Sequence, residues 1–437
     1  MPISTFMGLH TSLRGLLAEQ RALDVTSHNV ANANTQGYSR QEAQVQASDA
    51  LALPTGGRLG TGVDVVAYKR IRDSFLDLQY RAQSMQVGAG TTRTDALDQA
   101  ELRLSEPGDN GIAARLSSFW NTWADLANAP DSGAAKQALI EGARTLASSI
   151  NALDQGLQTV STQAADELAA LTGSGGELQQ IGKELAGLNG AIRDVQRVGG
   201  QPNDLLDRRD VLLDRLSNLA QVSVADDGAG SIRVTLGNAG SPLVDGSTLN
   251  WPPPAMTSPG GKLGALVDLS SPTGTIASYR SDVAAFAQAL TTQVNAIYNP
   301  AAGADFFTYD AGTATLSLNP AVTAANVRAG AGAAGDNSAA LALSELRGVS
   351  GGPDDLYSRF VTRVGTEVAD ARRSTLNATA LSDSIEDRRQ STAGVSLDEE
   401  MTNLIRFQRG YQAAARAMST TDTMLDTLIN RTGRVGL

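Results

Sequence analysis

The sequence predicts a mainly α fold with a small β part. Three observations support this prediction: both ends of the chain carry heptad patterns, helical patterns dominate the middle, and strand patterns are short and few. We therefore expect paired long N- and C-terminal coiled-coil-like helices and a helical-bundle middle domain with a β-ribbon. A small β-rich outer domain would be inserted in that middle domain.

The first element is a helix expected over residues 4–34. Its apolar residues recur in steps of four and three, which is the spacing of a coiled-coil seam. Gly8 and Gly15 are its only glycines, and the segment contains no proline. The predicted seam positions are Leu9, Leu13, Leu16, Gln20, Leu23, Ser27 and Val30.

The string HNVANANTQGYSR, residues 28–40, ends this helix. Asn29, Asn32 and Asn34 crowd the last turns, and Gly37 follows. Asparagine tolerates left-handed backbone and bonds its own main chain, so the cluster turns the chain. A helix cap alone would explain why the asparagines lie at the end of the helix, but it would not require so elaborate a string. We therefore interpret HNVANANTQGYSR as both a helix cap and a sequence signature.

Two extended segments, residues 38–48 and 62–71, follow the signature and predict a β-ribbon. In the second segment Val63, Val65 and Ala67 alternate with other residues, as in a half-buried strand. The chain then enters an amphipathic helix, RDSFLDLQYRAQS.

Amphipathic helices rich in Ala and Leu are expected from residue 88 to residue 220, separated by Gly- and Pro-containing breakers. Residues 221–271 instead show short strand patterns, VSV, SIRVTL and ALVDL, between turn strings. The remaining elements are a helix over 276–298, a hairpin over 306–320, and helices over 337–346 and 354–389.

The last element is a second heptad helix over residues 396–430. Ser396 and Glu399 form a capping-box start, and Gly433 offers a stop. Either terminal helix alone would expose an apolar stripe to water, so the two need each other or other copies of the chain. The predicted C-terminal seam positions are Leu397, Met401, Leu404, Gln408, Tyr411, Ala415, Met418, Asp422, Leu425 and Ile429.

These elements suggest three domains. Residues 1–37 and 397–437 form a terminal coiled-coil domain. Residues 38–220 and 272–396 form a helix-rich middle domain. Residues 221–271 form a small β-rich outer domain, to which the hairpin over 300–320 is a candidate addition.

Composition excludes several classes of function. The formal charge of −11 and the pI near 4.8 argue against binding to nucleic acid or an anionic membrane. The chain has no cysteine, which excludes disulfides and thiol catalysis. No apolar run approaches the roughly 20 residues of a membrane helix, and the first residues lack the pattern of a cleaved Sec signal.

No motif predicts an enzyme, a cofactor or a metal. Gly330, Gly332 and Gly335 match the spacing of a dinucleotide fingerprint, but no apolar strand pattern precedes them. His10 and His28 are five helical turns apart, about 27 Å, so they cannot bind one ion together.

Paired acidic residues lack the ligand spacing of an EF-hand loop. Trp120 and Trp123 on one helix face would suit a ligand groove, but the apolar core is the better interpretation.

The two ends resemble the bacterial flagellar axial proteins, which comprise rod, hook and hook-associated proteins. ALDVTSHNVANANTQGYSRQ resembles their N-terminal signature, and SLDEEMTNLIRFQRGYQAAARAMSTTDTMLDTLIN is similar to their C-terminal block. The long helical middle, including PNDLLDRRDVLLDRLSNLAQVSV, resembles the hook-associated members. The signature positions are His28, Asn29, Ala31, Asn32, Asn34, Thr35, Gly37, Tyr38 and Arg40.

This resemblance implies a structural subunit at the junction between hook and filament. The alternative is another axial protein, such as a second junction protein or a hook or rod subunit. The resemblance also implies export through the flagellar type III apparatus and an extracellular place on the flagellum after a transient cytoplasmic stage. The implied partners are further copies in a ring or helical tier, hook protein below, a second junction protein above, and a cytoplasmic export chaperone on the C-terminal helix. Nucleic acid and membrane insertion are not implied.

The heptad stripes suggest how such a subunit would assemble. In the assembly, the terminal helices would pack into an inner tube, and we expect them to be disordered or chaperone-bound in the free subunit. Two roles remain open for the polar seam residues, which either set the register between subunits or face the lumen of the tube. These residues are Gln20, Ser27, Gln408 and Asp422.

Overall fold

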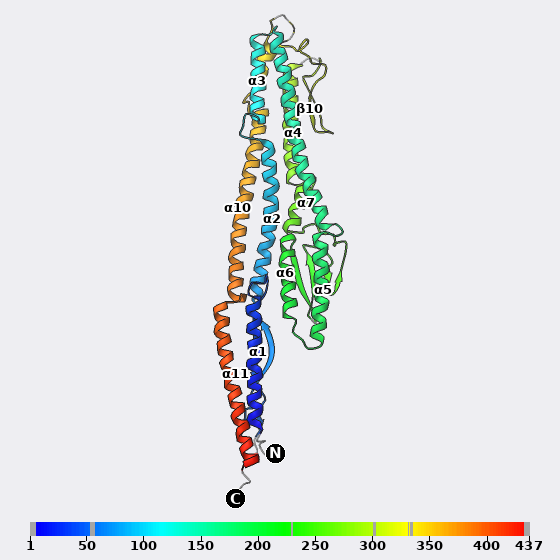
Figure 1. Ribbon diagram of the computed structural model, residues 1–437. Coiled ribbons are helices and arrows are strands. Elements are labelled where there is room, and N and C mark those ends of the chain that lie inside the picture. Colours follow the sequence, from blue (N-terminus) through cyan, green and yellow to red (C-terminus); the bar gives the residue numbers. More distant parts are fainter. Residues whose placement is uncertain are drawn as a thin grey trace.

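The computed structural model describes residues 6–52, 57–228, 230–299, 303–330, 332 and 335–431. The molecule is elongated and built mainly of helices, and its four sheets are small (Figure 1). The predicted mainly α class with a small β part is therefore confirmed. The expected stop at Gly433 lies outside the described residues.

The two terminal helices, α1 (Met7–Asn32) and α11 (Leu397–Asp426), lie side by side at one end of the molecule (Figure 1). We call this pair the terminal coil. The side chain of Ser396 caps the start of α11, as its sequence predicts. A single π-helical segment, Thr427–Arg431, follows α11.

A two-stranded ribbon packs beside α1. Strand β1 (Gln41–Ala47) pairs antiparallel with β4 (Val63–Arg70), and the register shifts between Gln44 and Val45. The ribbon continues into the short pair β2 (Leu51–Ala52) and β3 (Arg58–Leu59).

The helices α2 (Ser74–Leu104) and α10 (Pro353–Ala393) run along each other and continue the long axis beyond the terminal coil (Figure 1). We call this pair the stem. The Asp73 side chain caps α2 by accepting a hydrogen bond from Phe75 N, and Pro353 lies in the first turn of α10.

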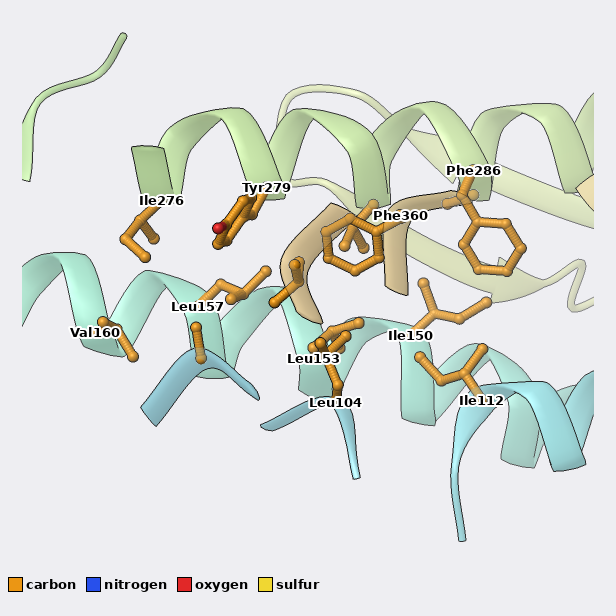
Figure 2. Packing of buried hydrophobic residues seen from close by; sticks show 14 of the residues in the cluster. Leu104, Ile112, Ile150, Leu153, Leu157, Val160, Ile276, Tyr279, Phe286 and Phe360 are labelled. Atoms are coloured by element: carbon orange, nitrogen blue, oxygen red, sulfur yellow. The ribbon is translucent and has the colours of Figure 1, made fainter. Parts of the chain in front are cut away.

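A helical body surrounds the far end of the stem. Side chains of α8, including Ile276 and Tyr279, pack against Leu153 and Leu157 of α4 (Figure 2). Trp120 and Trp123 are 1% and 0% exposed, so the interpretation of both as core residues is confirmed. The helices of this body are α3 (Ile112–Asn128), α4 (Gly133–Thr172), α7 (Gly261–Ser270), α8 (Thr275–Tyr298) and α9 (Ser338–Ser344).

The predicted hairpin forms from β9 (Phe307–Asp310) and β10 (Thr315–Leu318). Asn151 of α4 holds it, because its side chain accepts from Leu316 N at 2.9 Å and donates to Leu316 O at 2.8 Å. The hairpin thus belongs with α4 (Figure 1). It is not part of the four-stranded sheet of residues 222–249, here called the outer sheet, to which it was a candidate addition.

The outer sheet packs against α5 (Glu177–Arg197), which pairs with α6 (Asn203–Leu219). Asn189 of α5 is fully buried and donates to Ile232 O and Gly246 O in the sheet. The sheet has the order β5 (Val222–Gly228), β6 (Ser231–Leu236), β7 (Val244–Asp245), β8 (Thr248–Leu249).

One predicted strand is wrong. The segment ALVDL, residues 265–269, lies within helix α7. Leu263, Leu266 and Leu269 recur at three-residue intervals and are buried, which is a helical face directed at the stem and α4. A short apolar run fits a buried strand as well as a buried helix, so only the tertiary contacts decide between them.

Candidate assembly surface

The terminal coil is antiparallel with a constant register. Gly8 lies beside Thr421 and Gly15 beside Ala414, and Gly410 lies beside Glu19. At each of these three points a glycine lies opposite the other helix, twice on α1 and once on α11, and Ala18 and Ala22 of α1 are each 7% exposed. A glycine on one helix allows the other helix to approach closely.

The predicted C-terminal seam divides into two faces. Leu404, Tyr411 and Met418 are half-buried towards α1, and Leu425 is 8% exposed. Leu397 and Met401 are 52% exposed, and Ile429 is 68% exposed. One part of the predicted seam therefore packs against α1 within the subunit, and the other part is exposed to solvent.

The predicted N-terminal seam is only partly covered. On α1, Leu13 is 39% exposed, and Leu9, Leu16, Leu23 and Val30 are half-buried. Residues that the heptad pattern missed extend the uncovered surface. We call the exposed apolar residues of α1, of α11 and of the π-helical segment after it the outer stripe, which has one group at 397–405, one at 424–429 and a third on α1. Its members are Leu13, Leu17, Leu397, Met401, Ile405, Met424, Leu428 and Ile429.

The terminal helices are thus paired with each other in this structure. This differs from the expectation that they are disordered in a single subunit, and glycines that the heptad pattern did not register, Gly8, Gly15 and Gly410, lie at the points of contact. The pairing covers only one face of each helix, and the outer stripe remains in contact with water.

The signature residues lie where the terminal coil meets the stem. Asn29 is 1% exposed and uses both atoms of its amide. Its Nδ2 donates to Gln41 O at 2.9 Å and to Glu400 Oε2 at 3.2 Å. Its Oδ1 accepts from Gln41 N at 2.9 Å and from the Tyr38 hydroxyl at 2.8 Å. Asn29 therefore links α1 to the ribbon and to α11.

Tyr38 occupies a pocket between α1 and α6. Its hydroxyl also lies 3.0 Å from His28 Nδ1. Burial, and then the negative charges of Asp204, Asp207 and Glu400, raise the pKa of Tyr38 well above its ordinary value. The phenol therefore stays protonated and acts as a hydrogen-bond donor.

Arg40 binds the start of α11. Its Nη1 lies 2.7 Å from Glu399 Oε2, and its Nε lies 2.8 Å from Glu400 Oε1. Its main-chain N donates to Ala393 O, the last residue of the stem helix α10, at 2.9 Å. One residue of the signature thus holds both sides of the turn between α10 and α11.

The other signature residues form the turn itself. Asn32 Nδ2 donates to His28 O at 3.0 Å, and Thr35 Oγ1 donates to Asn32 Oδ1 at 3.2 Å. Gly37 has a φ of +75°, and a Cβ there would lie 2.1 Å from Val211 Cγ2 of α6. Ala31 and Asn34 are exposed.

A cluster of arginines and carboxylates fixes the stem to α6, and sequence reasoning missed it. Asp207, Asp210 and Asp214 recur at steps of three and four on α6, so they share one helix face. Asp210 Oδ2 lies 2.9 Å from Arg70 Nη1 and 3.5 Å from Arg72 Nη1. Every side chain of this group except that of Glu386 is at most 17% exposed: Arg70, Arg72, Arg81, Arg389, Asp77, Asp207, Asp210, Asp214 and Glu386.

Open clefts flank the signature. One of about 750 Å³ lies between residues 33–40 and the turn from α10 to α11. A second, of about 690 Å³, lies between the signature and α5 and α6. These clefts are polar or open, and neither brings together groups for acid–base chemistry.

The described residues do not form the metal or dinucleotide sites that the sequence offered as candidates. Among the described residues no group of three or more His, Asp or Glu is placed to hold a metal. Residues 320–330 form turns and bends, so no strand leads into Gly330 as a dinucleotide site requires. His10 and His28 are both exposed on α1. None of the described helices combines the length and apolar character of a membrane span.

Three family models match the chain. The model for the flagellar hook-associated protein FlgK helical domain matches residues 97–251. The flagellar basal body rod FlgEFG protein C-terminal model matches residues 388–431, and the flagella basal body rod protein model matches residues 9–38. The last two ranges coincide with α11 and α1, together with their neighbouring turns.

Individual proteins match over nearly the whole chain. Flagellar hook-associated protein 1 of Bacillus subtilis is 31% identical over 504 aligned positions, covering 98% of this chain and 99% of that protein. The Escherichia coli protein of the same name is 26% identical, covering 97% and 99%. A solved structure, the flagellar hook junction protein FlgK from Burkholderia pseudomallei, has a TM-score of 0.46 at 22% identity and covers 53% of this chain and 46% of that chain.

Proposed function

This chain belongs to the flagellar hook-associated protein 1 family, and we propose that it forms the junction between hook and filament. Its relatives are structural proteins of the flagellar axis, so the chain is a flagellar structural protein. Within the flagellum, the proposed work is mechanical: the subunit assembles with copies of itself and with the proteins on either side.

The observation that supports this proposal is the outer stripe. The seam inside the subunit is already filled by Leu404, Tyr411, Met418 and Leu425, yet apolar side chains remain uncovered on both helices. Groups of large exposed apolar side chains on one part of a protein often mark a surface that another protein covers. We propose that other copies of the terminal coil pack against these side chains, because each copy has an equivalent outer stripe.

The contact between copies is proposed to be head-to-tail. Such a contact does not close on itself as a twofold dimer does, and it generates a ring or a helical tier. Apolar burial drives the step, and each fully buried Leu, Ile or Met contributes about 1.5–3 kcal/mol relative to its exposed state. Of the predicted assembly residues, Leu13, Leu397, Met401 and Ile429 are proposed to contact other copies, with the half-buried Leu9, Leu16, Leu23 and Val30 beside them. Leu404, Tyr411, Met418 and Leu425 are proposed to act within the subunit, by holding the two terminal helices together.

The domains are proposed to form layers around a central channel. Residues 1–37 and 397–437 would line the inner tube, and the helix-rich middle would surround it. The packing of α7 against α2 and α4 supports a smaller outer module than residues 221–271, consisting of β5 to β8 together with α5.

The partners and location are proposed by analogy with the family. We propose hook protein below the tier and the second junction protein above it. Export would use the flagellar type III apparatus, with a cytoplasmic chaperone on α11 beforehand, and the assembled protein would be extracellular. The exposed stripe on α11 is a suitable chaperone surface, because it is apolar and lies at the end of the chain.

A double substitution in the outer stripe tests this function. Leu13→Glu with Met401→Glu places two charges on the proposed interface, and both side chains are exposed in the subunit. We expect the variant to be exported but not incorporated, so that cells lacking the native protein keep hooks and lose attached filaments. Gln412→Glu, an exposed polar position on α11, is the matched control and should restore filaments.

The position of the protein along the flagellum distinguishes a junction protein from a hook or rod subunit. Gold label on an epitope-tagged chain should mark the boundary between hook and filament in electron micrographs. Label along the hook or within the rod would instead identify a hook or rod subunit. Normal filaments in the double variant would contradict the role of the outer stripe.

A further inference from the structure

The start of α11 is held by a buried carboxylate that the assembly surface does not use. Glu400 is 1% exposed, although it lies in the first turn of a helix whose other residues are mostly exposed. Its two oxygens face Asn29 Nδ2 at 3.2 Å and Arg40 Nε at 2.8 Å. Oε1 is buried and makes an ion pair with Arg40 without a hydrogen bond, whereas Oε2 accepts one from Asn29. Burying a carboxylate is costly unless a charge or a donor offsets it, so Glu400 depends on both partners.

We propose that Asn29, Glu400 and Arg40 form a latch that sets the angle between the terminal coil and the stem. On this view the signature is a positioning device within one subunit and not a contact between subunits. Its residues would determine where the outer stripe points, and so which neighbours it reaches. The latch rests on contacts within the subunit and goes beyond the proposed place of the protein in the flagellum.

The position of the latch supports this role. α11 packs along α1, and α10 packs along α2, so the turn between α10 and α11 is where the coil could swing relative to the stem. Arg40 crosses that turn, because its main-chain N bonds Ala393 O while its side chain binds Glu399 and Glu400. Ile71 N in turn donates to Arg40 O at 2.8 Å, which connects the end of the ribbon to the same point.

The latch is anchored on a second side by α6. Ser39, next to Arg40, donates from its hydroxyl to Asp207 Oδ1 at 2.7 Å and from its main chain to Asp207 Oδ2 at 3.0 Å. Gln41 Nε2 donates to Asp204 Oδ1 at 3.0 Å. Hydrogen bonds and ion pairs therefore connect α11 to Asn29, and the neighbouring signature residues to α6. Loss of the Asn29–Glu400 link would leave the seam of the terminal coil intact but release its orientation.

Two charge-altering substitutions separate a latch from an ordinary stabilising pair. Asn29→Asp puts a second carboxylate opposite Glu400, and like charges in a buried site repel. Asn29→Asp also removes the donor that Asn29 Nδ2 provides to Gln41 O. Glu400→Gln, as a separate variant, removes the charge that Arg40 faces. Asn34→Asp is the matched control, since it makes the same chemical change at an exposed position of the same signature.

The readout is the distance between the terminal coil and the stem in the soluble full-length chain. The protein has no cysteine, so Gln408→Cys on α11 and Ser374→Cys on α10, both exposed, give two unique spin-label sites for pulsed electron paramagnetic resonance. We expect a single narrow distance distribution in the labelled parent and in Asn34→Asp. Asn29→Asp and Glu400→Gln should each broaden it.

Hydrogen exchange provides a second readout if Asn29→Asp proves hard to purify. Glu400→Gln keeps an acceptor for Asn29 but removes the charge partner of Arg40, and it should speed amide exchange in the first turns of α11 by about tenfold. Glu399→Gln, at an exposed neighbouring carboxylate, should change that exchange much less. These measurements use the free subunit, so their outcome is independent of where the protein assembles.

Two results would overturn the latch. A broad distance distribution in the labelled parent would mean that the angle is not set within the subunit. A narrow distribution that persists in Asn29→Asp, with only a lower melting temperature, would show that the pair stabilises the fold without orienting the coil.

Discussion

Individual residues of the signature have chemical types that match their contacts. Asn29 needs both a donor and an acceptor, because it faces main-chain groups of Gln41 and a carboxylate at once. Tyr38 needs a hydroxyl that stays protonated, and its surroundings provide this. Arg40 needs a forked cation that reaches two carboxylates. These contacts all lie within the subunit.

Gly37 should not tolerate a side chain. Its φ of +75° is strained for alanine, and the added Cβ would also collide with Val211. We expect Gly37→Ala to lower the free energy of unfolding by about 1–3 kcal/mol, measured by urea denaturation. Gly187→Ala is the control, because Gly187 is helical with open space around its Cβ position, and it should be neutral or slightly stabilising. Equal effects of the two substitutions would contradict this account.

The pKa of Asp210 links stability to pH. Burial acts to raise it, but the guanidinium groups of Arg72, Arg70 and Arg81 outweigh burial, so the pKa lies below its ordinary value. A carboxyl whose pKa is depressed on folding stabilises the native state above its unfolded pKa, about 3.9. That contribution disappears as the pH falls through the lower folded value.

We therefore expect urea denaturation to show a loss of stability below about pH 4 that is shallower in Asp210→Asn. At pH 7 the variant should lose about 3–5 kcal/mol, because it leaves buried arginines without their shared partner. Asp194→Asn, at an exposed carboxylate of α5, should leave the pH profile unchanged. If the free energy of unfolding falls equally steeply below about pH 4 in Asp210→Asn and in the parent, Asp210 does not cause the loss of stability in acid.

Helix patterns were predictable from the sequence, but the contact faces of the terminal helices were only partly so. The heptad pattern selects large apolar residues, and on α1 most of these are half-buried, whereas glycines that the pattern does not register, Gly8 and Gly15, lie against α11. The cluster on α6 had a signal, the spacing of Asp207, Asp210 and Asp214. Its arginine partners come from distant segments, so only the folded chain identifies them.

The small residues of α1 should be essential for the terminal coil. Gly15→Leu adds volume where α11 approaches closely, because a Cβ at this position would lie 3.9 Å from Ala414 Cβ, and overpacking of this kind costs about 1–3 kcal/mol. We expect amide exchange to accelerate along α11 while the helical body keeps its protection. Gln20→Leu adds the same side chain on the exposed side of α1 and should leave α11 unaffected. The seam assignment would be wrong if both variants behaved alike.

The whole molecule divides into a well-buried body and a sparsely buried terminal coil. Helix α4 contributes twelve buried residues, whereas α11 contributes two, Glu400 and Leu425. Local stability follows apolar burial, so the two parts should open with very different free energies. The coil is folded by its internal seam, and the proposed assembly would supply the burial that it lacks.

Hydrogen–deuterium exchange of the free subunit and of the assembled tier, compared peptide by peptide, tests this account most directly. We predict fast exchange along α1 and α11 in the free subunit, strong protection of α4 and α8 in both states, and a large gain of protection in the terminal helices on assembly. Terminal helices already as protected as α4 in the free subunit, with no change on assembly, would contradict the claim that the outer stripe drives polymerisation.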